Sequence, residues 1–415
     1  MDADSLRSAG EATDPIKISI IGCPFQTTYG DYIAALRQGL EPLVGASVQW
    51  VSTNCGCGDP VEIARQFHSG DRDHFELPTV VAGFNIVGYS ASPLKRALKT
   101  GVRSLGADLR ATRFAQLSRD ADVIHLQQTL GAFGSDSAFR LLQRPIAAAR
   151  VITLHELDPE QTDFPQRNPI YNLADALIVH DSLLKARLAS LNVDPDRIHV
   201  VCCGTDLAEH VDPAPRDGIV FYGGHNLNKS KGLETLFRAY RALRATSATP
   251  PPRLRIHGHY GEAPPPEAIR LAEHVGIASD IDWLNSLSLD DTARLYRRSQ
   301  VCVLPYTGSF AGLPAGIAAA NRLPIIATRF AGIPDHIGDL GVRIAGDDPA
   351  ELAEKLKTLL ADEAVQRAQG EQLRAHAERR LGWASVARDT LAVYRAAQRQ
   401  AMRRSLQTAP AGRRA

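Results

Sequence analysis

Short apolar runs alternate with amphipathic segments along most of the chain. Runs such as residues 16–22, 123–128 and 149–154 are rich in isoleucine, valine and leucine, and segments with apolar side chains at helical spacing lie between such runs. Continuous apolar runs of this length are typical of strands that are buried on both faces of a parallel sheet. The alternation therefore predicts an α/β protein in which helices cover both faces of parallel sheets.

The pattern is interrupted at residues 207–218, a segment with two prolines, several acids and a closing glycine. Such a break predicts a domain boundary. The alternation then restarts and runs to a final long helix at residues 382–400. We therefore expect an N-terminal domain at 1–212, a second domain at 213–385, and a C-terminal helix with a basic tail at 386–415 that packs back on the first domain.

The expected architecture is two Rossmann-like parallel-sheet domains that face each other across a cleft. In such proteins the default ligand site lies between the domains, at the carboxyl ends of the strands.

Composition and charge narrow the class of protein. Apolar residues make up 44% of the chain and charged residues 22%, and the formal net charge is +1, which gives no electrostatic case for nucleic acid as a partner. The sequence lacks an apolar run of transmembrane length, and its polar, acidic N-terminus is unlike a signal peptide. A cytoplasmic protein is the expectation. The arginines from Arg395 to Arg414 leave two roles open, a solvated end or weak contact with an anionic membrane surface.

Neither the cysteines nor the acids predict a metal site. The six cysteines are scattered, and NCGCG at 54–58 is the only pair with ligand spacing. A zinc site needs about four ligands, and the sequence supplies no second cluster. The DRD segment at 71–73 lies among polar residues without a strand before it. We interpret both as loops and expect no bound metal.

Four segments of the C-terminal half resemble the glycosyltransferases of the GT-B fold, and among them the retaining family 4. They are GIVFYGGHNLNKSKGLETLFRAYRAL, LRIHGHYG, DIDWLNSLSLDDTARLYRRSQVCVLPY and SFAGLPAGIAAANRLPIIATRFAGIPD, in the order expected for a donor domain. The N-terminal half matches more loosely, through DADVIHLQQ, VITLHELD and NLADALIVHDSLLKARL. The likeness covers most of residues 16–400.

This resemblance implies an enzyme that moves a sugar from a nucleotide-diphosphate sugar to a small-molecule or glycan acceptor, with retention. It implies no cofactor and no strict requirement for a metal. Two alternatives stay open: a catalytically inactive protein that still binds the sugar nucleotide, and another GT-B reaction such as that of a sugar phosphorylase. The oligomeric state is left open by the sequence.

The resemblance also implies the donor-binding residues. Lys231, in a Lys-Gly context, matches the phosphate-binding lysine of the family, with Lys229 as a weaker candidate. Gly223 and Gly224 let the backbone approach the phosphates. The N–H groups of Gly312 and Leu313 face the diphosphate from a helix N-terminus, with Pro314 at the first helical position. Leu284 and Leu287 lie in the segment that resembles the nucleotide-base loop.

Two positions depart from the family pattern. Family members carry two glutamates separated by seven residues, which bind sugar hydroxyls and the ribose, whereas this chain has Ser309 and Ile317 there. The change removes charge-assisted hydrogen bonds worth roughly 1.5–3 kcal/mol each. Because neither acid is the nucleophile or the base in the usual scheme, the change predicts altered donor contacts or a lost activity.

The acceptor side is assigned to the N-terminal half. His155 follows a predicted strand and matches a family histidine close to the reacting sugar, so we expect it to be catalytic. Gln127 and Glu156 lie at or just after strand ends and are expected to face the acceptor. Thr27, Thr28 and Gly30 stand where the family has a glycine loop, with Asp31 as a helix cap. His125 and His180 are interpreted as structural.

Overall fold

The computed structural model describes most of the 415 residues, in ranges separated by gaps: 15–22, 27–45, 48–52, 108–109, 111–128, 135–155, 170–207, 216–224, 229–258, 260, 263–308, 312–330 and 332–408. They form two compact units. One contains Met1–Ile178, Asp196–His199 and Ala387–Ala415, and the other contains Val179–Pro195 and Val200–Val386. Each unit is described by itself.

The N-terminal sheet has six strands in the order β2-β1-β3-β4-β5-β6. β1 pairs in parallel with both β2 and β3, and β3 pairs in parallel with β4. The side chains of β1 and β4 are buried along their whole length, as the continuous apolar runs predict. The strands are β1 (Ile18–Gly22), β2 (Val48–Ser52), β3 (Val123–Gln128), β4 (Ala149–Leu154), β5 (Ala176–Val179) and β6 (Ile198–Val200).

The described helices of the N-terminal half include α1 (Thr27–Val44), α5 (Ser135–Gln143) and α7 (Ser182–Ser190). α1 begins at Thr27, so the predicted loop at Thr27–Gly30 is instead its first turn, and Asp31 lies inside the helix rather than at its cap. The physical reason is that no proline precedes Tyr32 in the helix to end it, and threonine costs little in a helix that a buried apolar face already stabilises.

The second sheet also has six strands, in the order β12-β11-β10-β7-β8-β9, with the neighbouring pairs parallel. It forms the centre of a large apolar core. The strands are β7 (Ile219–Gly224), β8 (Leu254–Gly258), β9 (Ile281–Asn285), β10 (Val301–Leu304), β11 (Ile325–Thr328) and β12 (Val342–Ile344). The two parallel sheets confirm the predicted fold class of two Rossmann-like units.

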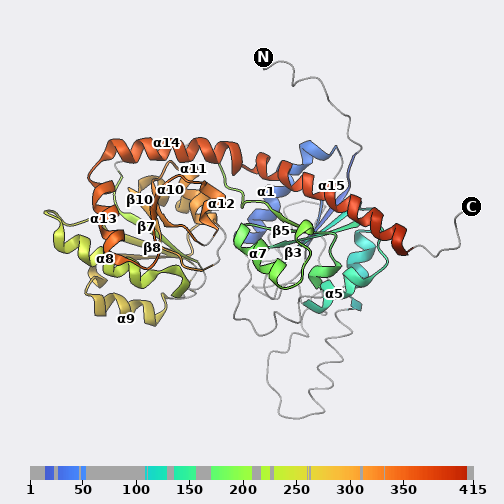
Figure 1. Cartoon of the computed structure of the whole chain (residues 1–415), viewed down its shortest axis with the longest axis horizontal. Helices are drawn as coiled ribbons and strands as arrows, with labels where there is room; N and C mark the ends of the chain where they lie inside the picture. Colours follow the sequence, from blue (N-terminus) through green and yellow to red (C-terminus); the bar gives the residue numbers. More distant parts are fainter. Residues whose placement is uncertain are drawn as a thin grey trace, which may run out of the picture. The chain divides into compact units, whose positions relative to one another are not determined.

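Helices lie on both faces of the second sheet (Figure 1). α8 packs with α9 and α13, and α11 packs with α10, α12 and α14. These helices are α8 (Leu233–Thr246), α9 (Pro266–Val275), α10 (Leu289–Arg298), α11 (Leu313–Ala320), α12 (Ile333–Ile337), α13 (Pro349–Leu360) and α14 (Glu363–Arg380). The last helix, α15 (Trp383–Thr408), brings Tyr394 and Arg404 to the N-terminal unit, where Arg404 pairs with Asp175 at 2.6 Å.

In each sheet the chain reverses its direction of travel once. In the first sheet it passes from β1 to β2 and then returns to β3 on the other side of β1. In the second it passes from β7 through β8 to β9 and then returns to β10 beside β7. Ligands of open parallel sheets bind outside the carboxyl ends of the strands at such points. The carboxyl ends of β1 and β3, and of β7 and β10, are therefore the expected ligand sites.

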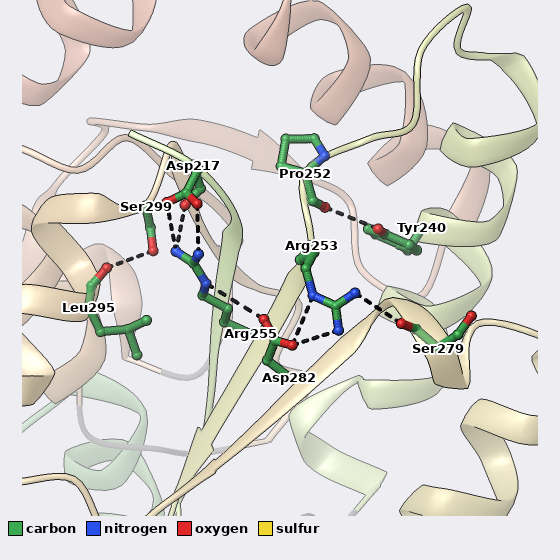
Figure 2. Close-up of polar contacts among 9 residues, drawn as sticks. All are labelled: Asp217, Tyr240, Pro252, Arg253, Arg255, Ser279, Asp282, Leu295 and Ser299. Atoms are coloured by element: carbon green, nitrogen blue, oxygen red, sulfur yellow. Dashed lines mark hydrogen bonds and ion pairs between the residues drawn. The ribbon is translucent and has the colours of Figure 1, made fainter. Parts of the chain in front are cut away.

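The opposite, amino ends of β7–β9 carry a cluster of paired charges (Figure 2). The Arg255 guanidinium donates to both carboxylate oxygens of Asp217, at 3.1 and 3.0 Å. Arg253 donates to Asp282 at 2.6 Å and to the Ser279 carbonyl at 3.0 Å. These contacts tie the starts of three strands together on the side of the sheet away from the expected ligand site.

Among the described residues, no helix combines the length and the apolar composition needed to span a bilayer. The predicted linker at 207–218 falls largely on residues 208–215, which lie outside the described part of the chain.

Candidate functional site

Lys231 lies at the switch point of the second sheet, in a short 3₁₀ helix (Lys229–Lys231) that joins β7 to α8. Only 1% of its surface is exposed. Burying an ammonium group is costly unless the surroundings compensate for the lost water. Its Nζ lies 4.5 Å from the ring centroid of Tyr306 and 5.7 Å from that of Tyr222, so two aromatic faces provide part of that compensation.

Tyr306 is itself held rigidly at the end of β10. Its hydroxyl donates to the Tyr222 carbonyl at 2.5 Å, and its own carbonyl accepts from the Thr328 hydroxyl at 2.5 Å. Its ring packs edge-on against Phe221, with the centroids 6.0 Å apart. Burial raises the pKa of Tyr306 well above its ordinary value, so the phenol stays protonated and remains a donor. The Lys231 ammonium thus rests on a fixed support.

Gly232, which follows Lys231, has to be a glycine. Its φ is +67°, and a Cβ there would overlap the carbonyl oxygen of Pro305. The backbone N–H of Thr307 donates to the Ser230 carbonyl at 2.8 Å, which fastens the loop after β10 to the 3₁₀ helix. The Lys-Gly pair is therefore explained by packing: the glycine lets the lysine segment lie directly against the end of β10.

Two more glycines allow close packing of the strand ends near the Lys231 ammonium group. Gly224 ends β7 with φ at +66°, and a Cβ there would lie 3.5 Å from the Lys231 Nζ. Gly258 ends β8, and a Cβ there would lie 2.6 Å from the Gly224 carbonyl oxygen. Gly223 lies in β7 beside Gly224 and is buried. The predicted glycine pair thus occupies the strand end next to the predicted cation.

The start of α11 follows β10 at the same switch point. Gly312 is the N-cap residue and Leu313 the first helical residue, so Pro314 stands second rather than first. Proline is tolerated there because the first four N–H groups of a helix have no partner within it. A Cβ on Gly312 would overlap the ring of His336, so this backbone lies directly on a buried imidazole. No side chain stands at Gly312 to cover the N–H groups of the first turn.

Ile317 lies one turn further along α11. It is half-buried and packs against the apolar core of the unit. Ser309 lies outside the described residues, so the structure places only one of the two positions at which the family has acids. At the Ile317 position there is an apolar side chain that neither carries charge nor forms hydrogen bonds.

Leu284 and Leu287 lie at the carboxyl end of β9 and just after it, and both are half-buried. Between them Ser286 has φ at +49°, and its N–H donates to the Gly258 carbonyl at 2.8 Å. The Asn285 side chain accepts from the Tyr260 N–H at 2.9 Å. The two leucines therefore belong to a tight turn that is fastened to the end of β8.

In the N-terminal unit, His155 directly follows β4 and is 5% exposed. Its Nε2 lies 2.7 Å from the Gln127 Oε1 at the end of β3, and its ring meets Tyr32 of α1 edge-on, with the centroids 4.9 Å apart. β3 and β4 are neighbours in the sheet, which explains why two residues far apart in the sequence meet. His180 is fully buried and its Nδ1 lies 2.8 Å from the Val201 carbonyl.

Two predicted site residues, Glu156 and Ser309, lie outside the described residues, and so do the NCGCG and DRD segments that we interpret as loops. Thr27, Thr28 and Gly30 lie in the first turn of α1, and Lys229 in the 3₁₀ helix, as far as the backbone is concerned. In the part of the chain that the structure describes, no group of histidines, cysteines and acids is arranged to hold a metal ion.

The second unit therefore has a buried cation, an aromatic support and glycine strand ends beside one another, and α11 begins after the neighbouring strand β10. A fixed ammonium and N–H groups at a helix start are two of the groups that commonly bind phosphate in proteins. The sequence predicted Lys231 and the glycines, but not the role of Tyr306 and Tyr222. An aromatic residue at each of two strand ends was the only signal for it.

Comparisons with known proteins concern the family and the fold. The family model described as "Glycosyl transferases group 1" matches residues 216–362, and the one described as "Glycosyltransferase Family 4" matches residues 58–209. A glycosyltransferase from Rickettsia africae has a similar fold, with a TM-score of 0.68 at 15% identity over 93% of this chain and 99% of that one. Each half of this chain therefore matches a glycosyltransferase family model, and the fold is similar to that of a solved glycosyltransferase.

Two further similarities concern individual proteins. A D-inositol 3-phosphate glycosyltransferase from Corynebacterium kroppenstedtii is 30% identical over 57% of this chain and 56% of its own. The chain spans about half the length of the curated relatives it matches. The structure of Anabaena Alr3699/HepE in complex with UDP covers 91% of this chain and 99% of that one, with a TM-score of 0.64 at 14% identity.

Proposed function

We propose that this protein is a glycosyltransferase that moves a sugar from a nucleoside-diphosphate sugar to a small-molecule or glycan acceptor, with retention at the transferred carbon. The observation that carries the proposal is the buried Lys231 at the switch point of the second sheet, beside Gly224 and near the loop that leads to α11.

The chemistry requires this kind of site. Transfer breaks the bond between the anomeric carbon and the diphosphate, and negative charge grows on the leaving diphosphate. The Lys231 ammonium and the N–H groups of Gly312 and Leu313 stabilise that charge. Because the cation is held in place by Tyr306 before any reaction starts, little of its stabilising effect is lost to reorganisation. His155 is assigned a hydrogen bond to the sugar that is being transferred.

The relatives suggest which substrates to test first. The curated relatives are named for D-inositol 3-phosphate, and the Anabaena structure holds UDP. We therefore propose a UDP-sugar as the donor and a phosphorylated polyol as the first acceptor to try. Retention is supported by the resemblance to the retaining family alone.

A second candidate is a protein that binds a sugar nucleotide without turning it over. The apolar Ile317 favours it, because this side chain cannot replace a carboxylate that binds a ribose or sugar hydroxyl.

The test has two stages. Thermal shifts with UDP, GDP, TDP and ADP identify the nucleotide, and sugar transfer from the matching donors is then measured with inositol phosphates and other polyols. We expect stabilisation by UDP and transfer that His155→Ala lowers by roughly 100-fold. His274→Ala, at an exposed histidine of α9, is the matched control. Nucleotide binding with neither transfer nor donor hydrolysis would instead establish the binding protein, and turnover that requires inorganic phosphate would establish a phosphorylase.

A further inference from the structure

A chain of four buried polar side chains leads from α15 to His155 in the N-terminal unit. The Tyr394 hydroxyl lies 2.7 Å from the His125 Nδ1, and the Gln127 Nε2 lies 3.2 Å from the His125 Nε2. The Gln127 Oε1 in turn lies 2.7 Å from the His155 Nε2. None of these four side chains is more than 5% exposed. From these contacts we propose that Gln127 and His125 are positioning residues that fix the tautomer and the ring orientation of His155.

The proton positions follow from the groups involved. Burial lowers the pKa of His125 to about 3, so its imidazole is neutral and has one donor and one acceptor. The Gln127 amide N–H donates to the His125 Nε2, which must then be the acceptor, and the Thr153 hydroxyl lies 2.7 Å from the same atom. The proton of His125 is therefore on Nδ1, where it is donated to the Tyr394 oxygen.

The other end of the amide sets the state of His155. The Gln127 Oε1 can only accept, so the His155 Nε2 must carry a proton. In the neutral ring the lone pair is then on Nδ1. The distances support this amide orientation: the reversed amide would place two nitrogens 2.7 Å apart, at the short limit even for an N–H···O bond. With this tautomer, the Nδ1 of neutral His155 is an acceptor rather than a donor.

Two packing contacts fix the positions of the Gln127 and His155 side chains. Gly22 ends β1 beside Gln127, and a Cβ at Gly22 would lie 3.0 Å from the Gln127 Cβ and 2.5 Å from the Ile33 Cδ1. The glutamine stem is therefore packed against bare backbone. The Tyr32 ring, at 86° to the His155 ring, restricts the tilt of the imidazole. Because both side chains are confined, a lost hydrogen bond cannot readily be replaced by a rotation.

The catalytic role of these hydrogen-bonded side chains rests on the proposed function, but the tautomer of His155 does not. The primary experiment is therefore nitrogen NMR of the histidine rings in the full chain, with resonances assigned by His125→Gln and His155→Gln variants. We expect His155 in the Nε2–H tautomer in the wild type. Gln127→Met removes the acceptor with little change in volume and should give mixed tautomers. Gln127→Glu restores an acceptor and should restore the Nε2–H form.

Kinetics then provide the second measurement. Gln127→Met should lower kcat about tenfold, the scale of one buried hydrogen bond, and leave the KM for the donor within about twofold. Gln127→Glu should recover part of kcat. Tyr394→Phe, two hydrogen bonds further away, should give a smaller loss.

The matched control is Ser19→Ala. It removes a buried hydrogen bond between Ser19 of β1 and Ser118, and it does not alter the side chains that connect Tyr394 to His155. A fall in kcat equal to that of Gln127→Met would show that general loosening of the sheet is responsible. An unchanged His155 tautomer in Gln127→Met would overturn the positioning proposal while leaving the proposed function intact. If Gln127→Met gives mixed His155 tautomers but the wild-type protein transfers no sugar, the positioning proposal stands and the proposed function is refuted.

Discussion

The two ends of the second sheet handle charge in opposite ways. At the amino end, Arg255 and Arg253 are paired with Asp217 and Asp282, and Figure 2 shows the two pairs linked through Asp282, which also lies 3.9 Å from Arg255. At the carboxyl end, Lys231 is buried against two aromatic rings among glycines. The charges at the amino end are paired with carboxylates, and the carboxyl end places a cation beside aromatic rings and glycine backbone, an arrangement that suits an anionic ligand.

The largest expected effect comes from Gly232, which lets the Lys231 segment pack against the end of β10 at the carboxyl end of the second sheet. Gly232→Ala combines a positive φ with a collision against the Pro305 carbonyl, and should destabilise the protein by roughly 3 kcal/mol or more. The control is Gly276→Ala, where φ is +78° but nothing lies within 4 Å of the new Cβ, so about 1 kcal/mol is expected. Urea unfolding measures both. Equal losses would mean that the contact with the end of β10 is not what requires the glycine.

Lys231→Ala should give the next largest effect, on binding instead of folding. Removing a buried cation from a bound diphosphate should weaken UDP by roughly 2–4 kcal/mol, measured by calorimetry. Lys357→Ala, at an exposed lysine of α13, removes the same charge from the same unit and should leave the affinity unchanged. If both variants bind UDP as the wild type does, the carboxyl end is not the donor site.

Acid should weaken the carboxyl end through His336, whose ring lies under Gly312. Its Nδ1 contacts the Gly332 carbonyl at 3.0 Å and its Nε2 contacts the Cys203 N–H at 3.1 Å, which suits a neutral ring. Burial is the main cause that lowers the pKa of His336 below its ordinary 6.5. The unfolded chain therefore binds the proton more readily, so the stability is fully present above pH 6.5 and is lost as the pH falls toward the folded pKa.

The measurement is the free energy of unfolding at pH 7.5 and at pH 5.5. His336→Gln should lower stability at the higher pH and make the decline with acid shallower. His274→Gln, at an exposed histidine, should leave the decline as it is. A decline of the same steepness in His336→Gln would show that other buried groups account for the acid sensitivity.

The same contrast explains how much could be predicted from the sequence. Buried strands are continuous apolar runs, so both sheets could be predicted, and the family resemblance then selected Lys231 and His155 as site residues. The helix α14 could not be predicted from apolar spacing, because its sequence is largely polar. It buries Gln366 and Arg374 together with small residues. Arg374 donates to the Ala320 carbonyl at 2.6 Å, a contact that no periodicity reveals.

Contacts that depend on strand pairing also could not be predicted from the sequence. Tyr306 and Tyr222 are 84 residues apart and meet because β10 lies beside β7. Gln127 was predicted to face an acceptor, but its contact with His155 follows from the register in which Gln127 stands opposite Thr153. A pattern along the chain indicates which residues end strands. Only the order and register of the strands decide which of those residues meet.

The smallest expected effect belongs to the amino end, and it completes the contrast. Arg255→Gln removes a bidentate pair with Asp217 and a bond to its carbonyl at 2.7 Å, from a side chain that is only 16% exposed. We expect a loss of about 1–2 kcal/mol in urea unfolding and no change in UDP affinity. Arg253→Gln, where 52% of the side chain is exposed, should stay within about 0.5 kcal/mol of the wild type, because solvent screens its pair with Asp282. A weaker UDP affinity in Arg255→Gln at unchanged stability would contradict the division, because a charge at the amino end would then act on the ligand site.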